Sequence, residues 1–80
     1  MAERFVDASD LEPPEPLQVA LQAACALRPG ERVRVRVPRQ PYPLFGLLAE
    51  RGYTYESVAV RRGEDCVYDV VITRGLPHAP

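Results

Sequence analysis

The sequence predicts a two-layer α/β sandwich of order β-α-β-α-β-β, with a four-stranded mixed sheet and both helices on one of its faces. Three features carry this prediction. Residues 32–37 alternate strictly between arginine and valine, which is typical of a strand with one buried face. The tetrapeptide Pro-x-Pro-Leu occurs at residues 14–17 and again at 41–44, each time before an apolar run. Residues 62–65, Arg-Gly-Glu-Asp, have the composition of a hairpin turn between two β-like runs.

The first proline corner predicts where the first helix begins. Proline has no N–H and a φ fixed near −65°, so it fits the first turn of a helix and disrupts its interior. The pattern predicts a strand over residues 4–8 and a helix from Pro14 to about Arg28, which Pro29-Gly30 ends. Helical spacing predicts the following inward residues: Leu17, Leu21, Ala24 and Leu27 or Arg28.

The second half of the chain repeats this organisation. The strand over residues 32–37 is expected to be central, with its three valines beneath the helices and its arginines facing water. The second helix is predicted from about Tyr42 to Arg51, with Leu44, Leu47 and Leu48 inward and Gly52 after its end. The last two strands are predicted over residues 53–61 and 66–74.

Composition narrows the class of protein. The 80 residues, 46% apolar and 26% charged, indicate one globular domain over residues 1–74 and a flexible tail over 75–80. A net charge of −1 disfavours a general nucleic-acid binder. No apolar run approaches the ~20 residues that span a bilayer, and no signal-peptide pattern opens the chain, so the cytoplasm is the expected location.

The two cysteines and the single histidine predict no disulfide, metal site or cofactor. Cys25 lies in an alanine-rich helical stretch and is expected to be a small buried residue. Cys66 follows Glu64 and Asp65, whose carboxylates disfavour a reactive thiolate. His78 stands in the tail without nearby Cys or His partners.

The two proline corners are the predicted binding edge. In β-α-β units the loops after parallel strands gather at one edge of the sheet, where ligands commonly bind. The second corner suits an anion better, because Gln40, Tyr42 and Leu44 keep their N–H groups there and Arg39 adds a cation. Prolines remove three N–H donors from the first corner. The candidate ligand or partner residues are Glu12, Pro13, Glu15, Arg39, Gln40 and Tyr42.

The open arginine face supports a different prediction. Arg32, Arg34 and Arg36 are expected to pair across strands with Glu56 and Asp69.

Residues 6–17 resemble the opening of the TusA/SirA-like sulfur-carrier family, whose pattern is an apolar residue, Asp, a turn ending in Gly-Leu, and Cys-Pro-x-Pro. The matching residues are Asp7, Leu11, Pro14, Glu15 and Pro16. Asp10 replaces the glycine, and Pro13 replaces the cysteine that carries sulfur in the family. Across residues 5–74 the resemblance implies the spatial strand order 1-2-4-3.

The second corner, with Glu50-Arg51-Gly52-Tyr53 after it, resembles a cysteine-less sister branch. That branch is a bacterial domain of unknown function, found alone or beside hemerythrin-like modules. Together these features predict a non-enzymatic binding or protein-interaction module. Its expected partner is a protein or a small acidic ligand, and not a membrane.

Two other functions stay open. One is a sulfur-relay or thiol-redox protein that uses Cys66 in place of the missing cysteine. The other is an RNA-binding domain, because the same order of elements occurs in a translation-factor domain. The oligomeric state is left open by the sequence.

Overall fold

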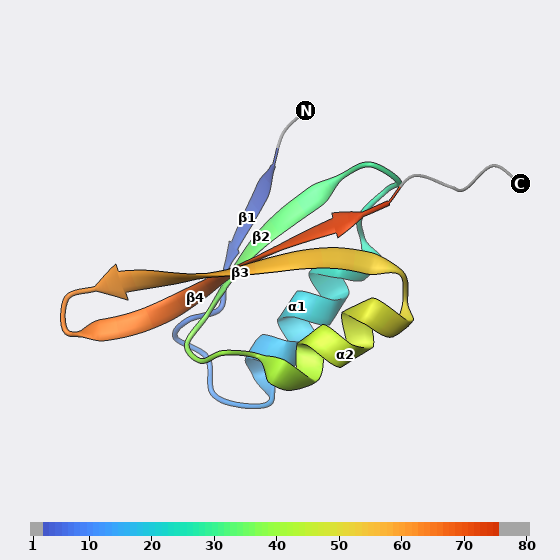
Figure 1. The fold of residues 1–80 in the computed structure, drawn as a ribbon. Coiled ribbons are helices and arrows are strands. Elements are labelled where there is room, and N and C mark those ends of the chain that lie inside the picture. The colour runs from blue at the N-terminus through green and yellow to red at the C-terminus, as the bar shows by residue number, and fades with distance from the viewer. Residues whose placement is uncertain (1–2, 76–80) are drawn as a thin grey trace, which may run out of the picture.

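A computed structural model describes residues 3–75 of the chain. Its elements follow the expected order: β1 (Arg4–Asp7), α1 (Glu15–Cys25), β2 (Arg32–Val37), α2 (Tyr42–Glu50), β3 (Tyr53–Arg62) and β4 (Asp65–Arg74). The four strands form one mixed sheet, and both helices lie on the same face of it (Figure 1). The predicted two-layer α/β sandwich is confirmed.

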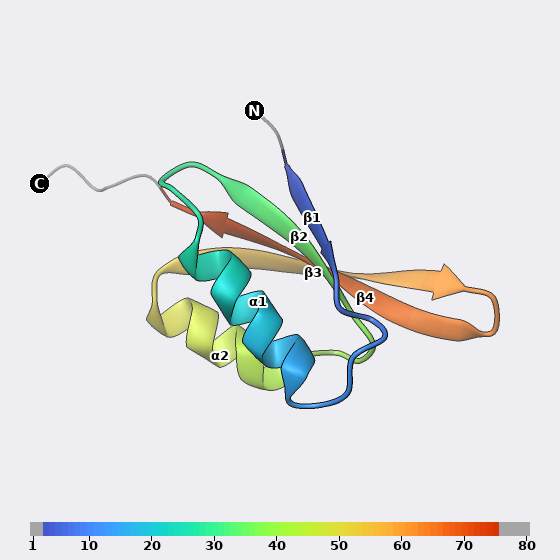
Figure 2. The same cartoon turned by 180° about the vertical axis from the view of Figure 1, so that it is seen from behind.

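The spatial order of the strands is β1-β2-β4-β3, the order that the family resemblance implied. β1 and β2 are parallel, and β4 pairs antiparallel with β2 on one side and β3 on the other. The β2–β4 ladder ends at the pair Val37–Tyr68, whereas the β3–β4 ladder continues to Arg62–Asp65. The far half of this hairpin therefore projects past the rest of the molecule (Figures 1 and 2).

The core lies between the sheet and the helices. Val33, Val35 and Val37 are at most 1% exposed, which confirms that this face of β2 lies beneath the helices. β4 contributes Val70 and Ile72 from the neighbouring strand. The other core residues come from the helices and the segments next to them: Ala8, Ala20, Ala24, Leu27, Leu44 and Leu48.

The inward face of α1 matches the prediction at Ala24 and at Leu27, which follows the helix, and differs from it at Leu17 and Leu21. Its buried residues are Pro16, Ala20 and Ala24, while Leu17 and Leu21 are half-buried at the margin of the core. Small side chains along the centre of the buried stripe let the helix backbone lie close to the sheet, and the leucines then fill the space beside it. Large apolar side chains therefore mark the border of this face and not its centre.

Both helices are slightly shorter than predicted. α1 ends three residues before Arg28, because the Leu27 N–H donates to the Ala24 carbonyl oxygen (3.0 Å) in a tighter turn. In α2, Leu44 and Leu48 are buried as expected, and Leu47 is half-buried. Gly52 follows α2 with a φ of +81°, which favours glycine at that position.

Cys25 is exposed, so its prediction as a buried residue is wrong. It follows Gln18 and Gln22 at helical spacing, and these three residues form the outer face of α1. Cys66 is also exposed, on the β3–β4 hairpin.

The predicted tail lies outside the described residues except for Gly75, and so does His78. In the part of the chain that the structure describes, no helix has the length and apolar character that crossing a membrane requires. Within residues 3–75, no three His, Cys, Asp or Glu side chains form a group that could hold a metal ion.

Candidate functional site

Asp7 organises the loop that leads to the first proline corner. Its Oδ1 accepts hydrogen bonds from the Ser9 hydroxyl (2.6 Å) and from the Ser9 backbone N–H (2.9 Å). These two hydrogen bonds hold the pKa of Asp7 below its usual value, and the positive charges of Arg36 and Arg62 act in the same direction. Arg62 Nη1 also donates to Ser9 Oγ (3.0 Å), which ties this loop to the far hairpin. The aspartate that matches the sulfur-carrier pattern is thus a turn residue here.

The first corner begins α1 with few free backbone donors. Pro14 occupies the N-cap position and Pro16 is buried in the first turn. The Pro13–Pro14 peptide bond is cis. The Glu15 N–H donates to the Glu12 carbonyl oxygen (2.9 Å). Because proline has no N–H, this helix start is a poor anion site.

The second corner is tied to β3 through Gln40. Its Oε1 accepts a hydrogen bond from Ser57 Oγ at 2.5 Å. The Tyr42 N–H donates to the Gln40 carbonyl oxygen (3.1 Å), and the Leu44 N–H donates to the Pro41 carbonyl oxygen (2.9 Å). The sequence counted these two N–H groups as available to an anion, and that expectation is wrong because the turn uses both.

The two corners lie at the same end of the helix layer (Figures 1 and 2). They enclose a groove of about 250 Å³. We call it the proline groove, because six of the nine prolines of the chain line it. Its lining residues are Pro13, Pro14, Pro16, Leu17, Val37, Pro38, Arg39, Gln40, Pro41 and Pro43. The surface is almost entirely hydrocarbon, with Arg39 and Gln40 as its polar side chains.

The structure brings together three of the six predicted site residues. Pro13, Arg39 and Gln40 share the wall of the proline groove. Glu12 and Glu15 are exposed on the first corner and are not among the lining residues. Tyr42 is 71% exposed and turns its ring to the edge of Phe45, with 6.1 Å between the ring centroids.

The sequence predicts a role for the prolines at the helix starts, but the apolar surface that they form together in the groove was not predicted. Pro38, Pro41 and Pro43 line the groove together with Pro13, Pro14 and Pro16. The repeated tetrapeptide is the sequence feature that could have predicted this surface. Two proline-rich loops after adjacent parallel strands must meet at one edge of the sheet, so that their rings form the walls between them.

The open face of the sheet is centred on a buried carboxylate, Asp69. Its Oδ1 accepts from Arg36 Nε (2.7 Å), and its Oδ2 accepts from Arg36 Nη2 (3.0 Å) and from Arg34 Nη1 (3.3 Å). The hydrogen bonds from Arg36 and Arg34 hold the pKa of Asp69 below its usual value and outweigh its burial. The same contacts raise the pKa of Arg36.

The predicted partner Glu56 does not take part in these pairs. β4 lies between β3 and β2, which keeps Glu56 away from the arginines. Glu3 lies beside Arg32 (3.7 Å) and Arg34 (3.8 Å) instead.

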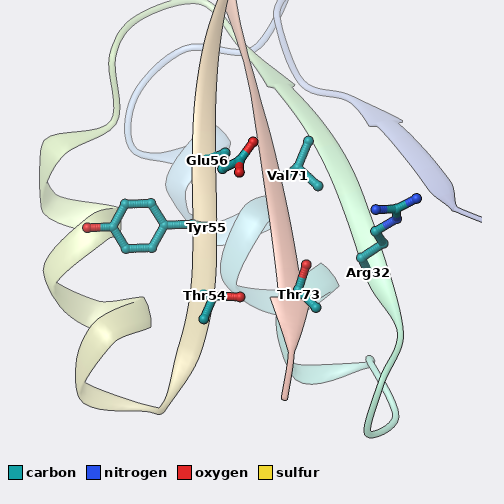
Figure 3. A pocket seen from close by; sticks show the side chains of 6 residues that line it. All are labelled: Arg32, Thr54, Tyr55, Glu56, Val71 and Thr73. Atoms are coloured by element: carbon teal, nitrogen blue, oxygen red, sulfur yellow. The ribbon is translucent and has the colours of Figure 1, made fainter. Parts of the chain in front are cut away.

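A second, smaller hollow of about 190 Å³ lies on the open face, away from the corners. Figure 3 shows its lining side chains, which come from β2, β3 and β4: Arg32, Thr54, Tyr55, Glu56, Val71 and Thr73. Thr54 and Thr73 are directly opposite each other in the ladder. The Arg32 guanidinium points away from these threonines, toward the β1 side of the sheet (Figure 3). This hollow is smaller than the proline groove and mixed in polarity, so the proline groove is the better candidate site.

The comparison with protein families gives a match over residues 6–74 to the family described as "Uncharacterized conserved protein (DUF2249)". The chain belongs to this family. No curated protein matches the chain. Among solved structures, a methyltransferase from Pyrococcus furiosus is similar, with a TM-score of 0.58 and 16% sequence identity. The match covers 95% of this chain and 44% of the methyltransferase, and at this identity it shows a shared fold alone.

Proposed function

We propose that this chain is a non-enzymatic binding module, and that its proline groove holds an apolar side chain of a partner protein beside Arg39. The observation that carries the proposal is the lining of the groove. An apolar concave surface with a few polar groups at its margin is the usual composition of a recognition site. The six prolines, Leu17 and Val37 supply the apolar surface, and Arg39 and Gln40 supply the polar groups.

The groove favours a hydrocarbon occupant over an anion that needs backbone donors. Six of its residues have no N–H. The N–H groups of Tyr42 and Leu44, at the start of α2, are bonded within the second corner. A phosphate would therefore find few of the donors that usually hold it at a helix N-terminus.

Arg39 gives the groove its charge preference. Its guanidinium can bind a carboxylate in a charge-assisted, two-pronged contact. Glu12 and Glu15, exposed on the first corner, disfavour an occupant with several negative charges. The expected partner segment therefore carries one acidic group next to an apolar side chain.

The walls are also rigid before binding. Each proline ring fixes its own φ, so ordering the groove costs little conformational entropy when an occupant enters. The hydrogen bond between Gln40 and Ser57 fixes the second corner further. This rigidity supports recognition of one side-chain shape.

The same site gives no support for sulfur transfer by the route of the sulfur carriers. We infer a TusA/SirA-like relationship from the strand order and from the motif at the first corner. Pro13, where that family keeps its cysteine, has no nucleophilic atom. The proposed role is therefore protein interaction, with the cytoplasm as the compartment that the sequence favours.

Exposure of Cys66 favours a thiol function as the second candidate. In that case the reactive group would lie on the projecting hairpin and not at the corners. RNA binding draws less support, because Arg34 and Arg36 direct their guanidinium groups to Asp69. Those bonds lower the positive charge that the open face presents to phosphates.

The test begins with selection of peptide ligands from a random display library and titration of a selected peptide. We expect selected peptides to combine a large apolar residue with one Asp or Glu. Arg39→Ala should weaken binding of such a peptide by about 1–3 kcal/mol, because a charge-assisted contact is lost, while unfolding stays nearly unchanged. Arg51→Ala is the matched control, because Arg51 is an exposed arginine at the other end of α2.

Cys66→Ser separates the two candidate functions in the same assay. The proposal requires unchanged peptide affinity in this variant. Loss of binding with Cys66→Ser, or binding that maps to the arginine face and ignores Arg39→Ala, would contradict the groove as the site.

A further inference from the structure

β3 is an edge strand of the sheet, and it is long and continuous. It pairs with β4 without interruption from Tyr53–Arg74 to Arg62–Asp65, so that it contains no bulge. Alternate residues of β3 direct both the backbone N–H and the C=O to β4, and the residues between them direct both groups outward. The other edge strand, β1, is short, with residues 4–7. β3 therefore offers the longer row of outward backbone donors and acceptors.

Edge strands in soluble proteins usually carry features that prevent pairing with another chain. β3 contains no proline, no glycine and no lysine, and its centre, residues 57–60, is Ser-Val-Ala-Val without a charge. Val58 in this centre is 46% exposed. Residues 60–62 also belong to the part of the hairpin that projects past β2, where neither helix lies beside them (Figures 1 and 2). This end of the β3 edge, residues 60–62, is open to another strand.

The sequence of β3 matches itself in one antiparallel register. A symmetric pair of β3 strands keeps both helix layers on the same side only if residues of the same parity face each other. With Ala59 opposite Ala59 of the second copy, Val58 lies opposite Val60 and Glu56 lies opposite Arg62. Each of these contacts occurs twice because the pair is symmetric.

The two neighbouring registers of the same parity fit less well. A shift toward the turn leaves Glu56 opposite no strand residue, because β3 ends at Arg62, and so removes the ion pair. A shift away from the turn places Glu56 opposite Val60 and removes the ion pair.

We propose that β3 is a self-association edge, at which a second copy of this chain pairs antiparallel about Ala59 to form a continuous eight-stranded sheet. The charge match of Glu56 with Arg62 and the contact of Val58 with Val60 select a second copy as the occupant. The proline groove lies at the corners and not on this edge, and the hydrogen bond from Ser57 of β3 to Gln40 joins the two surfaces.

Sedimentation of the full chain at concentrations from micromolar to millimolar tests the self-association. We expect a dimer whose dissociation constant rises about tenfold or more with Glu56→Arg, because two ion pairs become two like-charge contacts. The double variant Glu56→Arg with Arg62→Glu restores the match with the signs exchanged and should restore the dimer. Arg62 also donates to Ser9, so Ser9→Ala, which removes that bond together with the hydrogen bond from the Ser9 hydroxyl to Asp7, should leave the dimer unchanged.

A cysteine at the symmetry axis tests the register. Ala59→Cys, in a chain with Cys25→Ser and Cys66→Ser, should form an intermolecular disulfide under mild oxidation, because directly opposite Cα atoms lie within bonding range. Thr54→Cys in the same background is the matched control, because its two copies would lie roughly 34 Å apart.

A chain that stays monomeric through the millimolar range would overturn the proposal in favour of a strand from a different protein. A dimer whose dissociation constant does not change with Glu56→Arg, or that cross-links as well through Thr54→Cys as through Ala59→Cys, would also overturn the proposal. A dimer that the charge reversal weakens, the double variant restores and Ala59→Cys cross-links supports it.

Discussion

On the helix-covered face of the sheet Val35 lies opposite Val70, while one position along the same ladder Arg36 lies opposite Asp69 on the open face. Both pairs include side chains that are nearly inaccessible to water: Val35 and Val70 at 0% and Asp69 at 2%. The first pair is stabilised by removal of hydrocarbon from water, which does not depend on pH. The second depends on a charged carboxylate that keeps its hydrogen bonds. The two faces of one ladder therefore differ in their response to pH: the contribution of the apolar pair to stability does not depend on pH, and that of the charged pair does.

The largest effect is expected on the apolar side. Val35→Ala should lower the free energy of unfolding by about 1–3 kcal/mol, because it removes buried methyl groups and leaves a cavity under α1 and α2. Denaturant unfolding at pH 7 and again near pH 4 measures it. The loss should be the same at both pH values, and a loss that changes with pH would break the distinction between the two faces.

Asp69→Asn tests the polar side. We expect a loss of about 1–2 kcal/mol at neutral pH, because Arg36 and Arg34 then face an uncharged amide. In the native chain the pKa of Asp69 is lower in the folded state than in the unfolded state, so that the unfolded state binds more protons in acid. Its contribution is present above the unfolded pKa of about 4 and is lost as the pH falls through the lower folded value.

Unfolding of the native chain and of Asp69→Asn across this acid range measures that contribution. The decline in stability should be shallower in the variant. The remaining slope belongs in part to Asp7, whose pKa is also lowered in the fold. Glu50→Gln, at an exposed carboxylate of α2, is the control, and equal slopes for the native chain and Asp69→Asn would contradict the assigned role of Asp69.

The smallest effect is expected at the margin of the open face. The Arg32 side chain is 61% exposed, and its Nε lies 3.7 Å from Glu3. Arg32→Ala should change the free energy of unfolding by less than about 0.5 kcal/mol, because exposed ion pairs contribute little. The same denaturant titration detects the difference. A loss as large as that of Asp69→Asn would show that the arginines act as one cooperative network.

The fold was predictable because its signals are local. Strict alternation over residues 32–37, glycine after the second helix and proline at two helix starts each constrain the backbone directly. The inward face of α1 was less predictable. Ala20 and Ala24 are buried because the helix lies close to the sheet, which is a property of the tertiary packing. The burial of Asp69 depends likewise on which strands become neighbours.

The position of the candidate site was predictable from the sequence, and the chemical character of its lining was less so. Adjacent parallel strands bring the two corners together, which predicted Pro13, Arg39 and Gln40 at one edge. The hydrogen bonds of the Tyr42 and Leu44 N–H groups depend on the detailed turn geometry, and the sequence overestimated their freedom. The apolar walls were missed because each proline was assigned a backbone role, although its ring is also hydrocarbon surface.

The proline lining has a spectroscopic consequence. A proline carries no amide proton, so six of the ten residues around the groove give no signal in amide hydrogen exchange or in amide-detected NMR. The remaining reporters are Leu17, Val37, Arg39 and Gln40. An occupant that fills the groove would therefore shift a small set of amide resonances, while the α- and ring-carbon signals of the prolines record most of the contact.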